Sequence, residues 1–292
     1  MRMTRMDLSG KLSQASCHLY LVCLLLVVGF SVKIDGFSTL GGGKTLIAQN
    51  TYPETWSNPT GAVLREIVPD SVWVAERPFV WNSIDVGGRM AVLRLRDGGL
   101  WAHSPVALDA PLRAALADLG PVRHVVSPNY EHVKYAQNWI EAYPDAISYG
   151  CPGMKQQEPD IAFQKILSTG EDTISWLDEI DCCWFDCEHN PFTRKPFFNE
   201  VLFHHRESKT LLTTDLYWNY PSGPDVPFGT KAWKFGMDEV YLPFYKNLMI
   251  TDKGEFQKRV DNVLGWEFER IIPCHGSIVE QGSKKIFTSH FE

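Results

Sequence analysis

The sequence of 292 residues lacks several patterns that would identify a function directly. It has no Gly-x-Ser-x-Gly segment, which argues against the nucleophile of an α/β-hydrolase. The GGGKT segment at 41–45 has Ser38 where a phosphate-binding loop requires glycine, and no strand is expected before it. No internal repeat or low-complexity block is visible. These absences exclude a serine-hydrolase elbow and a nucleotide-binding loop.

Cysteines are few and do not form a framework. Two of the seven lie in the first 36 residues, which leaves an odd number, and no Cys-x-x-Cys pair occurs. Most of the others lie in apolar runs, so we expect buried free thiols. Free thiols favour a reducing compartment over the extracellular space.

Positive charge is also scarce. The formal net charge is −7, and outside the first 36 residues 24 basic side chains stand against 33 acidic ones. Because an acidic surface without a Lys/Arg-rich block repels phosphate backbones, we expect no nucleic-acid partner. The hydrophobic fraction of 44% is ample for a globular core.

Residues 1–36 are typical of an N-terminal targeting segment. Arg2, Arg5 and Lys11 precede the apolar run 19–32, which is 14 residues long. That length fits the core of a signal peptide (about 7–15 residues) better than a membrane span (about 20). Residues 37–66 are acid-poor and hydroxyl-rich, as in a transit peptide or disordered linker. The predicted destination is the plastid or the secretory pathway, with membrane contact only through an uncleaved leader.

The remainder, residues 67–292, reads as one domain. The first half predicts a hairpin that turns at residues 97–99, a helix that starts at Asp109 and stops at Gly120, a strand at 122–127, a helix at 131–143 and a further strand. The second half predicts strands at 180–189, 199–206 and 209–218, a Pro-rich loop, a helix at 255–266 and a last strand at 270–276. This order suits two packed sheets with helices outside. The aromatic residues near the Pro-rich loop either wall a pocket or pack in the core: Trp218, Tyr220 and Trp233.

Acidic and imidazole side chains follow three of the expected strands. Glu131 and His132 follow HVVSPN, Asp215 follows TLLTT, and His275 follows RIIPC. Loops at strand ends commonly carry sites, and these groups are suitable ligands for Zn²⁺ or Fe²⁺. Each also has an ordinary alternative, since Asn129 is a good helix cap, Asp opens turns and a loop histidine often bonds to backbone. Their recurrence at strand ends favours a metal site.

The segments LWAHSPVALDAPL, VSPNYEH, TLLTTDLYWN and IIPCHG resemble an uncharacterised domain-of-unknown-function family within the metallo-β-lactamase superfamily. The resemblance covers Val72 to the C-terminus. It implies an α+β fold, an αββα sandwich of two mixed β-sheets with helices on the outer faces. It also implies a metal site at the open edge between the sheets.

The resemblance implies a reduced set of metal ligands. The superfamily's first metal loop is His-x-His-x-Asp-His, and its first three ligand positions fall here on Ser127, Asn129 and Glu131. The second half of the ligand set is retained in kind, as Glu131, His132, Asp215 and His275, which supports one divalent metal, Zn or Fe. His189, at a strand end, is either a further ligand or a buried structural histidine.

Two functions therefore stand. The first is a metal-dependent hydrolase with a degenerate, mononuclear site and an unknown small-molecule substrate. The second is a non-catalytic binding or scaffold protein without a functional metal centre. An iron-dependent redox role is a weaker third. The sequence leaves open whether the chain is an enzyme, which residues would be catalytic and how many copies associate.

Overall fold

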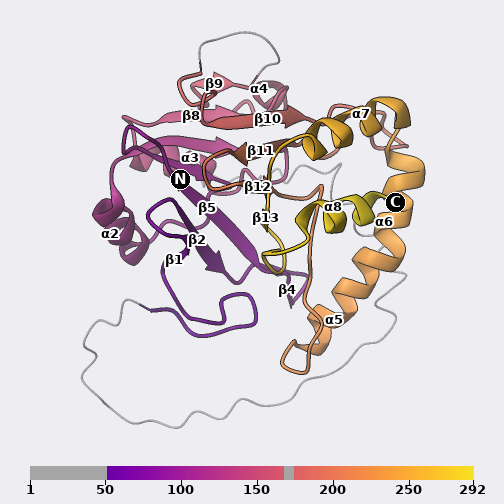
Figure 1. Cartoon of the computed structure of the whole chain (residues 1–292), viewed down its shortest axis with the longest axis horizontal. Helices are drawn as coiled ribbons and strands as arrows, with labels where there is room; N and C mark the ends of the chain where they lie inside the picture. The colour runs from indigo at the N-terminus through magenta and orange to yellow at the C-terminus, as the bar shows by residue number, and fades with distance from the viewer. Residues whose placement is uncertain (1–50, 168–173) are drawn as a thin grey trace, which may run out of the picture.

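The computed structural model describes residues 51–167 and 174–292 (Figure 1). The expected targeting segment at 1–36, and residues 37–50 of the expected linker, lie outside the described residues. Two larger sheets and a two-stranded hairpin account for the strands. The hairpin pairs β3 (Val80–Trp81) with β4 (Ile84–Asp85).

The first sheet is mixed and has the order β1-β2-β5-β6-β7-β8-β9. Its strands from β1 to β6 pair antiparallel, and those from β6 to β9 pair parallel. The parallel half contains the predicted βαβαβ unit. The strands are β1 (Arg65–Val68), β2 (Val72–Arg77), β5 (Gly88–Arg94), β6 (Leu100–His103), β7 (Val122–Ser127), β8 (Ile147–Gly150) and β9 (Lys165–Ile166).

The second sheet is also mixed and has the order β10-β11-β12-β13. The first three strands pair antiparallel, and β13 pairs parallel to β12. The predicted hairpin between residues 199–206 and 209–218 is present, but its second strand ends at Thr213. The strands are β10 (Ile180–Trp184), β11 (Val201–His205), β12 (Thr210–Thr213) and β13 (Arg270–Pro273).

Helices cover the outer face of each sheet (Figure 1). On the first sheet lie α2 (Ala110–Leu119) and α3 (Ala136–Ala142). On the second lie the helices after residue 227. The remaining helices are α4 (Met154–Gln157), α5 (Phe228–Phe235), η1 (Gly236–Tyr241), α6 (Leu242–Phe244), η2 (Tyr245–Met249), α7 (Lys253–Leu264) and α8 (Ser283–Phe291).

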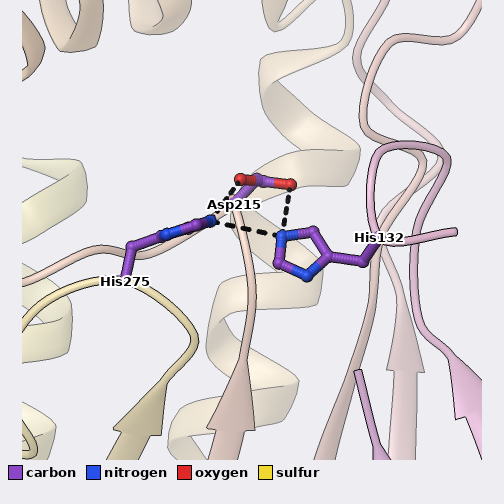
Figure 2. Close-up of side chains that lie close together, drawn as sticks. All are labelled: His132, Asp215 and His275. Atoms are coloured by element: carbon purple, nitrogen blue, oxygen red, sulfur yellow. Dashed lines mark hydrogen bonds and ion pairs between the residues drawn. The ribbon is translucent and has the colours of Figure 1, made fainter. Parts of the chain in front are cut away.

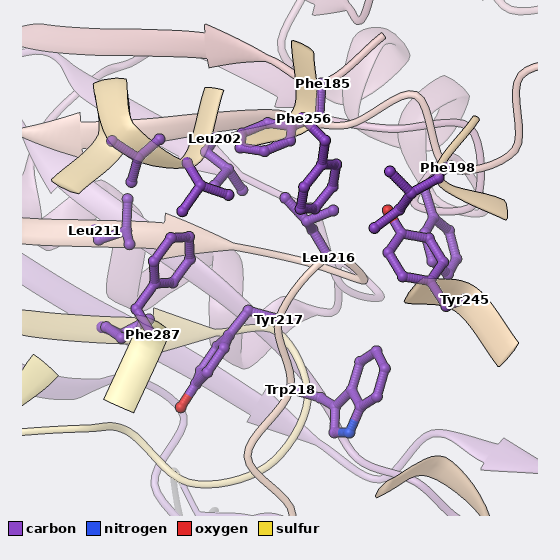
Figure 3. Packing of buried hydrophobic residues seen from close by; sticks show 14 of the residues in the cluster. Phe185, Phe198, Leu202, Leu211, Leu216, Tyr217, Trp218, Tyr245, Phe256 and Phe287 are labelled. Carbon is purple, nitrogen blue, oxygen red and sulfur yellow. The ribbon is translucent and has the colours of Figure 1, made fainter. Parts of the chain in front are cut away.

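The alternation of side chains along the buried strands explains the four layers, which are the two sheets and the helices on the outer face of each. On β11, Leu202 packs into the cluster that faces the outer helices, as Figure 3 shows. Its neighbours Val201 and Phe203 pack into the cluster between the two sheets. Because successive strand side chains point to opposite faces, an all-buried strand such as this one needs a layer on each side. The expected αββα sandwich is confirmed.

The start of one helix and the structure of one region differ from the prediction. The helix expected at 131–143 begins only at Ala136, because the side chain of Asn129 accepts hydrogen bonds from the backbone N–H groups of Glu131 and His132. Residues 228–249, for which no helix was expected, form a continuous helical stretch.

Residues 51–66 pack with the domain, although they were expected to belong to a linker. Tyr52 donates to the carboxylate of Asp109, and the indole N–H of Trp56 donates to the Asp85 carbonyl. Over the described ranges, no helix has the length and apolar character that a membrane span requires.

Candidate metal centre

Three of the predicted ligands meet at one edge of the sandwich. His132 follows β7, Asp215 follows β12 and His275 follows β13, so both sheets contribute (Figure 2). Their side chains are 12–14% exposed. In the described part of the chain, they are the one group of three His, Cys, Asp or Glu residues whose ligand atoms all lie within 4.8 Å of one another.

The spacing of the three donor groups fits one small metal ion. His132 Nε2 lies 3.2 Å from Asp215 Oδ2 and 3.3 Å from His275 Nε2, and His275 Nε2 lies 3.5 Å from Asp215 Oδ1. A tetrahedral ion with bonds of about 2.0–2.1 Å has ligand atoms roughly 3.3–3.4 Å apart. The two imidazole nitrogens and the Asp215 carboxylate, which faces one ring with each of its oxygens, are therefore spaced like the ligands on one face of a tetrahedron.

The other nitrogen of His275 is held in a way that leaves Nε2 available. Nδ1 lies 2.7 Å from the carbonyl oxygen of Gly87, which can only accept, so Nδ1 carries a hydrogen and donates it. In the neutral imidazole the lone pair is then on Nε2, the atom that faces Asp215. Metal-binding histidines commonly donate their second N–H to a carbonyl in this way.

The loops of Asp215 and His275 are held together by backbone pairing. Asn219 N–H donates to the His275 carbonyl, and Ser277 N–H donates to the Asn219 carbonyl. Gly276, at φ +88°, permits this approach, since a Cβ there would lie 2.1 Å from the Asn219 oxygen. This glycine fixes the relative position of two candidate ligands.

Asn129 connects two of the candidate ligands. Its Oδ1 accepts from the His132 N–H at 2.9 Å, and its Nδ2 lies 2.7 Å from Asp215 Oδ2. The residue is fully buried. Nδ2 also lies within hydrogen-bond distance of Thr214 Oγ1 and of Glu200 Oε2.

A second buried carboxyl group, that of Glu200, supports the Asp215 loop. It accepts from the backbone N–H groups of Thr214, Asp215 and Leu216 at 2.6–2.9 Å. These bonds take the N–H groups that a longer β12 would use, which explains why the strand ends at Thr213. Burial and the charge of Asp215 raise the pKa of the Glu200 carboxyl group.

The ionisation of His132 and Asp215 is strongly coupled. Burial by itself lowers the pKa of His132, but the charge of Asp215 and the neighbouring Cys274 hold that pKa well above 6.5. Burial by itself raises the pKa of Asp215, but the charges of His132 and His275 hold it well below 3.8. Without a metal, the two form a buried ion pair.

The other two predicted ligands lie elsewhere. Glu131 is exposed and is not in the group of converging ligand atoms. His189 is also outside that group, and its Nδ1 lies 2.8 Å from Thr251 Oγ1. β10 ends at Trp184, before His189, and the backbone N–H of His189 donates to the Met249 carbonyl at the end of η2.

The aromatic residues near the Pro-rich loop are core residues. Trp218, Tyr220 and Trp233 are all less than 10% exposed and belong to the cluster that faces the outer helices. Tyr220 also packs against the ring of His275, with ring centres 6.4 Å apart. It thus contributes to the wall beside the candidate ligand.

Three supporting residues were not recognised in the sequence as parts of the site: Ser104, Asn129 and Glu200. Ser104 Oγ lies 2.5 Å from His132 Nδ1. Ser104 and Asn129 follow strands, as the candidate ligands do, and that position was a usable signal. Glu200 precedes a strand, and its partners lie 14–16 residues ahead, so no local pattern indicated it.

Comparison with known proteins identifies the family of the chain. Residues 69–227, more than half of the chain, match the family described as "Domain of unknown function (DUF4336)". No curated protein sequence matches the chain.

Solved structures share the fold at low identity. The chain is similar to DIM-1 metallo-beta-lactamase exposed to ceftazidime (14% identity, TM-score 0.52, 82% of this chain and 96% of that one). It is similar to the metallo-beta-lactamase from Hirschia baltica (10%, 0.51, 78% and 97%). It is also similar to the metal-soaked Flv1 flavodiiron core from Synechocystis sp. PCC6803 (10%, 0.52, 78% and 59%). The architecture is thus the metallo-β-lactamase fold, and the chain belongs to the DUF4336 family.

Proposed function

We propose that this protein is a metal-dependent hydrolase-like protein with a mononuclear centre held by His132, Asp215 and His275. The observation that best supports this proposal is the set of donor groups at the edge of the sandwich. Two imidazoles and one carboxylate lie there with their nitrogen and oxygen atoms 3.2–3.5 Å apart. Three protein ligands leave at least one coordination position for water or substrate, as in catalytic zinc sites. The same set of two histidines and one carboxylate also suits Fe²⁺.

The charge balance supports a divalent cation. Asp215 and Glu200 are both buried, and Asn129 Nδ2 lies within hydrogen-bond distance of both carboxylates. Within the described residues, no Lys or Arg lies within 4.0 Å of either one. Because buried charges are normally paired or bound to metals, a dication would take over from protonated His132 as the counterion of Asp215.

The surroundings of Asn129 support one metal rather than two. Ser127 and Asn129 stand where the resemblance placed two metal-binding histidines. The Asn129 amide instead donates a hydrogen bond to Asp215 Oδ2. Ser127 Oγ is buried without a hydrogen-bond partner among the described residues. Neither side chain offers an imidazole to a second ion.

A bound Zn²⁺ or Fe²⁺ would supply Lewis-acid activation of water and of a substrate oxygen. The chain's own residues would do the rest. Gly87 and Asn129 fix the orientation of the ligands, and the exposed carboxylate of Glu131, next to His132, is the candidate proton acceptor. We propose that the substrate is a small molecule. We also propose that residues 1–36 direct the protein to the plastid or the secretory pathway.

A panel of small carboxylic esters, thioesters, lactams and phosphodiesters tests this function. The whole domain loaded with Zn²⁺ or Fe²⁺ should hydrolyse at least one class, and chelation or His275→Ala should abolish the activity. A loaded protein that binds one metal ion but hydrolyses nothing would favour the alternative, a non-catalytic binding or scaffold protein. The low exposure of the three ligands, 12–14%, is the observation that keeps this alternative open.

A further inference from the structure

Ser104 has a backbone conformation that its sequence context disfavours. It follows β6 directly and has φ +57°, in the left-handed region that side chains other than glycine rarely adopt. The next residue is Pro105, and residues before proline prefer extended backbone. Such strain persists only where the surrounding structure imposes it, and it concentrates at functional sites.

The strained conformation brings the Ser104 hydroxyl to a candidate ligand. The Ser104 N–H donates to the Val126 carbonyl, which ties the end of β6 to β7. The hydroxyl oxygen then lies 2.5 Å from His132 Nδ1, and the residue is 4% exposed. The partners are 28 residues apart, so this is a tertiary contact.

The strained backbone of Ser104 is not explained by a general requirement that a buried hydroxyl group has a hydrogen-bond partner. Ser127, at the end of the neighbouring strand β7, is 1% exposed, and its Oγ has no partner among the described residues. This fold therefore tolerates an unsatisfied serine hydroxyl close to the site. What distinguishes Ser104 is its contact with the imidazole.

We infer that Ser104 is a positioning residue whose hydroxyl fixes the ring of His132 so that Nε2, and not Nδ1, faces Asp215 and His275. Asn129 holds the backbone of His132, and Ser104 holds the far nitrogen of its ring. Two anchors define the direction of the Nε2 lone pair. The effect on metal affinity rests on the proposed function, whereas the contact and the strain do not.

The test compares Ser104→Ala, Ser104→Gly and the matched control Ser127→Ala in the full chain. Zn²⁺ affinity is measured by competition with a chromogenic chelator, and thermal unfolding is measured in excess chelator. Both Ser104 variants should lose about 10–100-fold in affinity, the usual effect of removing a partner of a metal-binding histidine. Ser127→Ala should bind Zn²⁺ as the wild type does.

Thermal unfolding separates the backbone strain from the hydroxyl contact. Ser104→Gly should melt at a higher temperature than Ser104→Ala, because glycine accepts a positive φ without strain. Wild-type Zn²⁺ affinity in both folded Ser104 variants would overturn the positioning role. If Ser104→Gly melts no higher than Ser104→Ala, the inference that the backbone of residue 104 is strained is wrong.

A double-mutant cycle covers the case in which the wild type binds no metal, which would refute the proposed function alone. In metal-free protein, Ser104→Ala should lower the melting temperature less in a His132→Ala background than in the wild type. An equal decrease in both backgrounds would show that the two side chains do not interact and would overturn the inference.

Discussion

Asp215 is the residue on which the charge of the site depends. It pairs with His132 and His275, and its charge raises the pKa of His132. Asp215→Asn keeps the shape but removes the charge, so we expect it to abolish stoichiometric metal binding and to lower the pKa of His132. Metal titration and an NMR pH titration of the His132 ring measure the two effects. Asp178→Asn, at an exposed carboxylate paired with Arg96, should change neither.

Asn129 should contribute to the stability of the fold because its amide joins a buried hydrogen-bond network. Asn129→Asp is nearly isosteric, but a carboxylate cannot donate, and it would lie beside the carboxylates of Asp215 and Glu200. Unfolding by urea should show a loss of about 2–4 kcal/mol, typical of breaking a buried polar network. The exposed Asn138→Asp should stay within about 0.5 kcal/mol of the wild type. Equal stability of the two variants would refute the connecting role of Asn129.

Sequence position identified the three converging side chains but not what holds them. His132, Asp215 and His275 were found because each follows a strand, and strand ends at one edge meet. Asn129 was interpreted as a helix cap at a lost ligand position, whereas its amide donates to Asp215, which lies 86 residues further along the chain. A partner at that separation has no local signal. His189 also follows a strand, but the structure places it beside Thr251, so strand-end position alone is not sufficient.

At the scale of the elements, α2 follows its sequence signals closely. Asp109 was the expected N-cap, and its carboxylate accepts from Leu112 N–H at 3.0 Å and from the Tyr52 hydroxyl. Removal of both bonds in Asp109→Ala should cost about 1–2 kcal/mol in the free energy of unfolding. Asp118→Ala, on the exposed face of the same helix, is the control and should cost less than about 0.5 kcal/mol. Chemical denaturation of both variants decides the comparison.

The helical stretch 228–249 shows where periodicity fails as a signal. It alternates between α-helix and π-helix, in η1 and η2, and contains Pro243. π-turns widen the helix and shift the apolar stripe away from the 3.6-residue period on which a sequence-based prediction depends. The start of α3 was misplaced for a different reason, since Asn129 holds the two following N–H groups in a turn.

At the scale of the whole molecule, the order of the expected elements predicted two packed sheets with helices outside, and the resemblance implied the αββα sandwich. Val201, Leu202 and Phe203 alternate between two clusters, which only a layered arrangement can provide. The covering of the second sheet by α8 was not expected, because this helix is short, and of its residues only Ser283 and Phe287 are buried.

Buried neutral histidines predict how stability depends on pH. Burial lowers the pKa of His103 to about 3 and the pKa values of His124, His205 and His290 to about 4. The unfolded chain takes up these protons near pH 6.5, so stability should fall as the pH drops from 6.5 towards 4. Each histidine contributes about 1.4 kcal/mol per pH unit in that window.

Two buried acids oppose this trend. Glu188, whose pKa burial raises to about 8, favours the folded state as the pH falls from 8 to 4.5. The raised pKa of Glu200 acts in the same direction, but these are two groups against the four histidines. Urea unfolding in chelator between pH 7 and 4.5 measures the net effect. A free energy of unfolding that stays constant or rises on acidification would contradict the prediction.

The metal content of the purified chain tests the central claim most directly. Elemental analysis should find about one Zn or Fe per chain in the wild type and none in His132→Ala or His275→Ala. His189→Ala should retain the metal, since His189 lies outside the converging group. A wild-type protein without stoichiometric metal, or two ligand variants that keep it, would contradict the account.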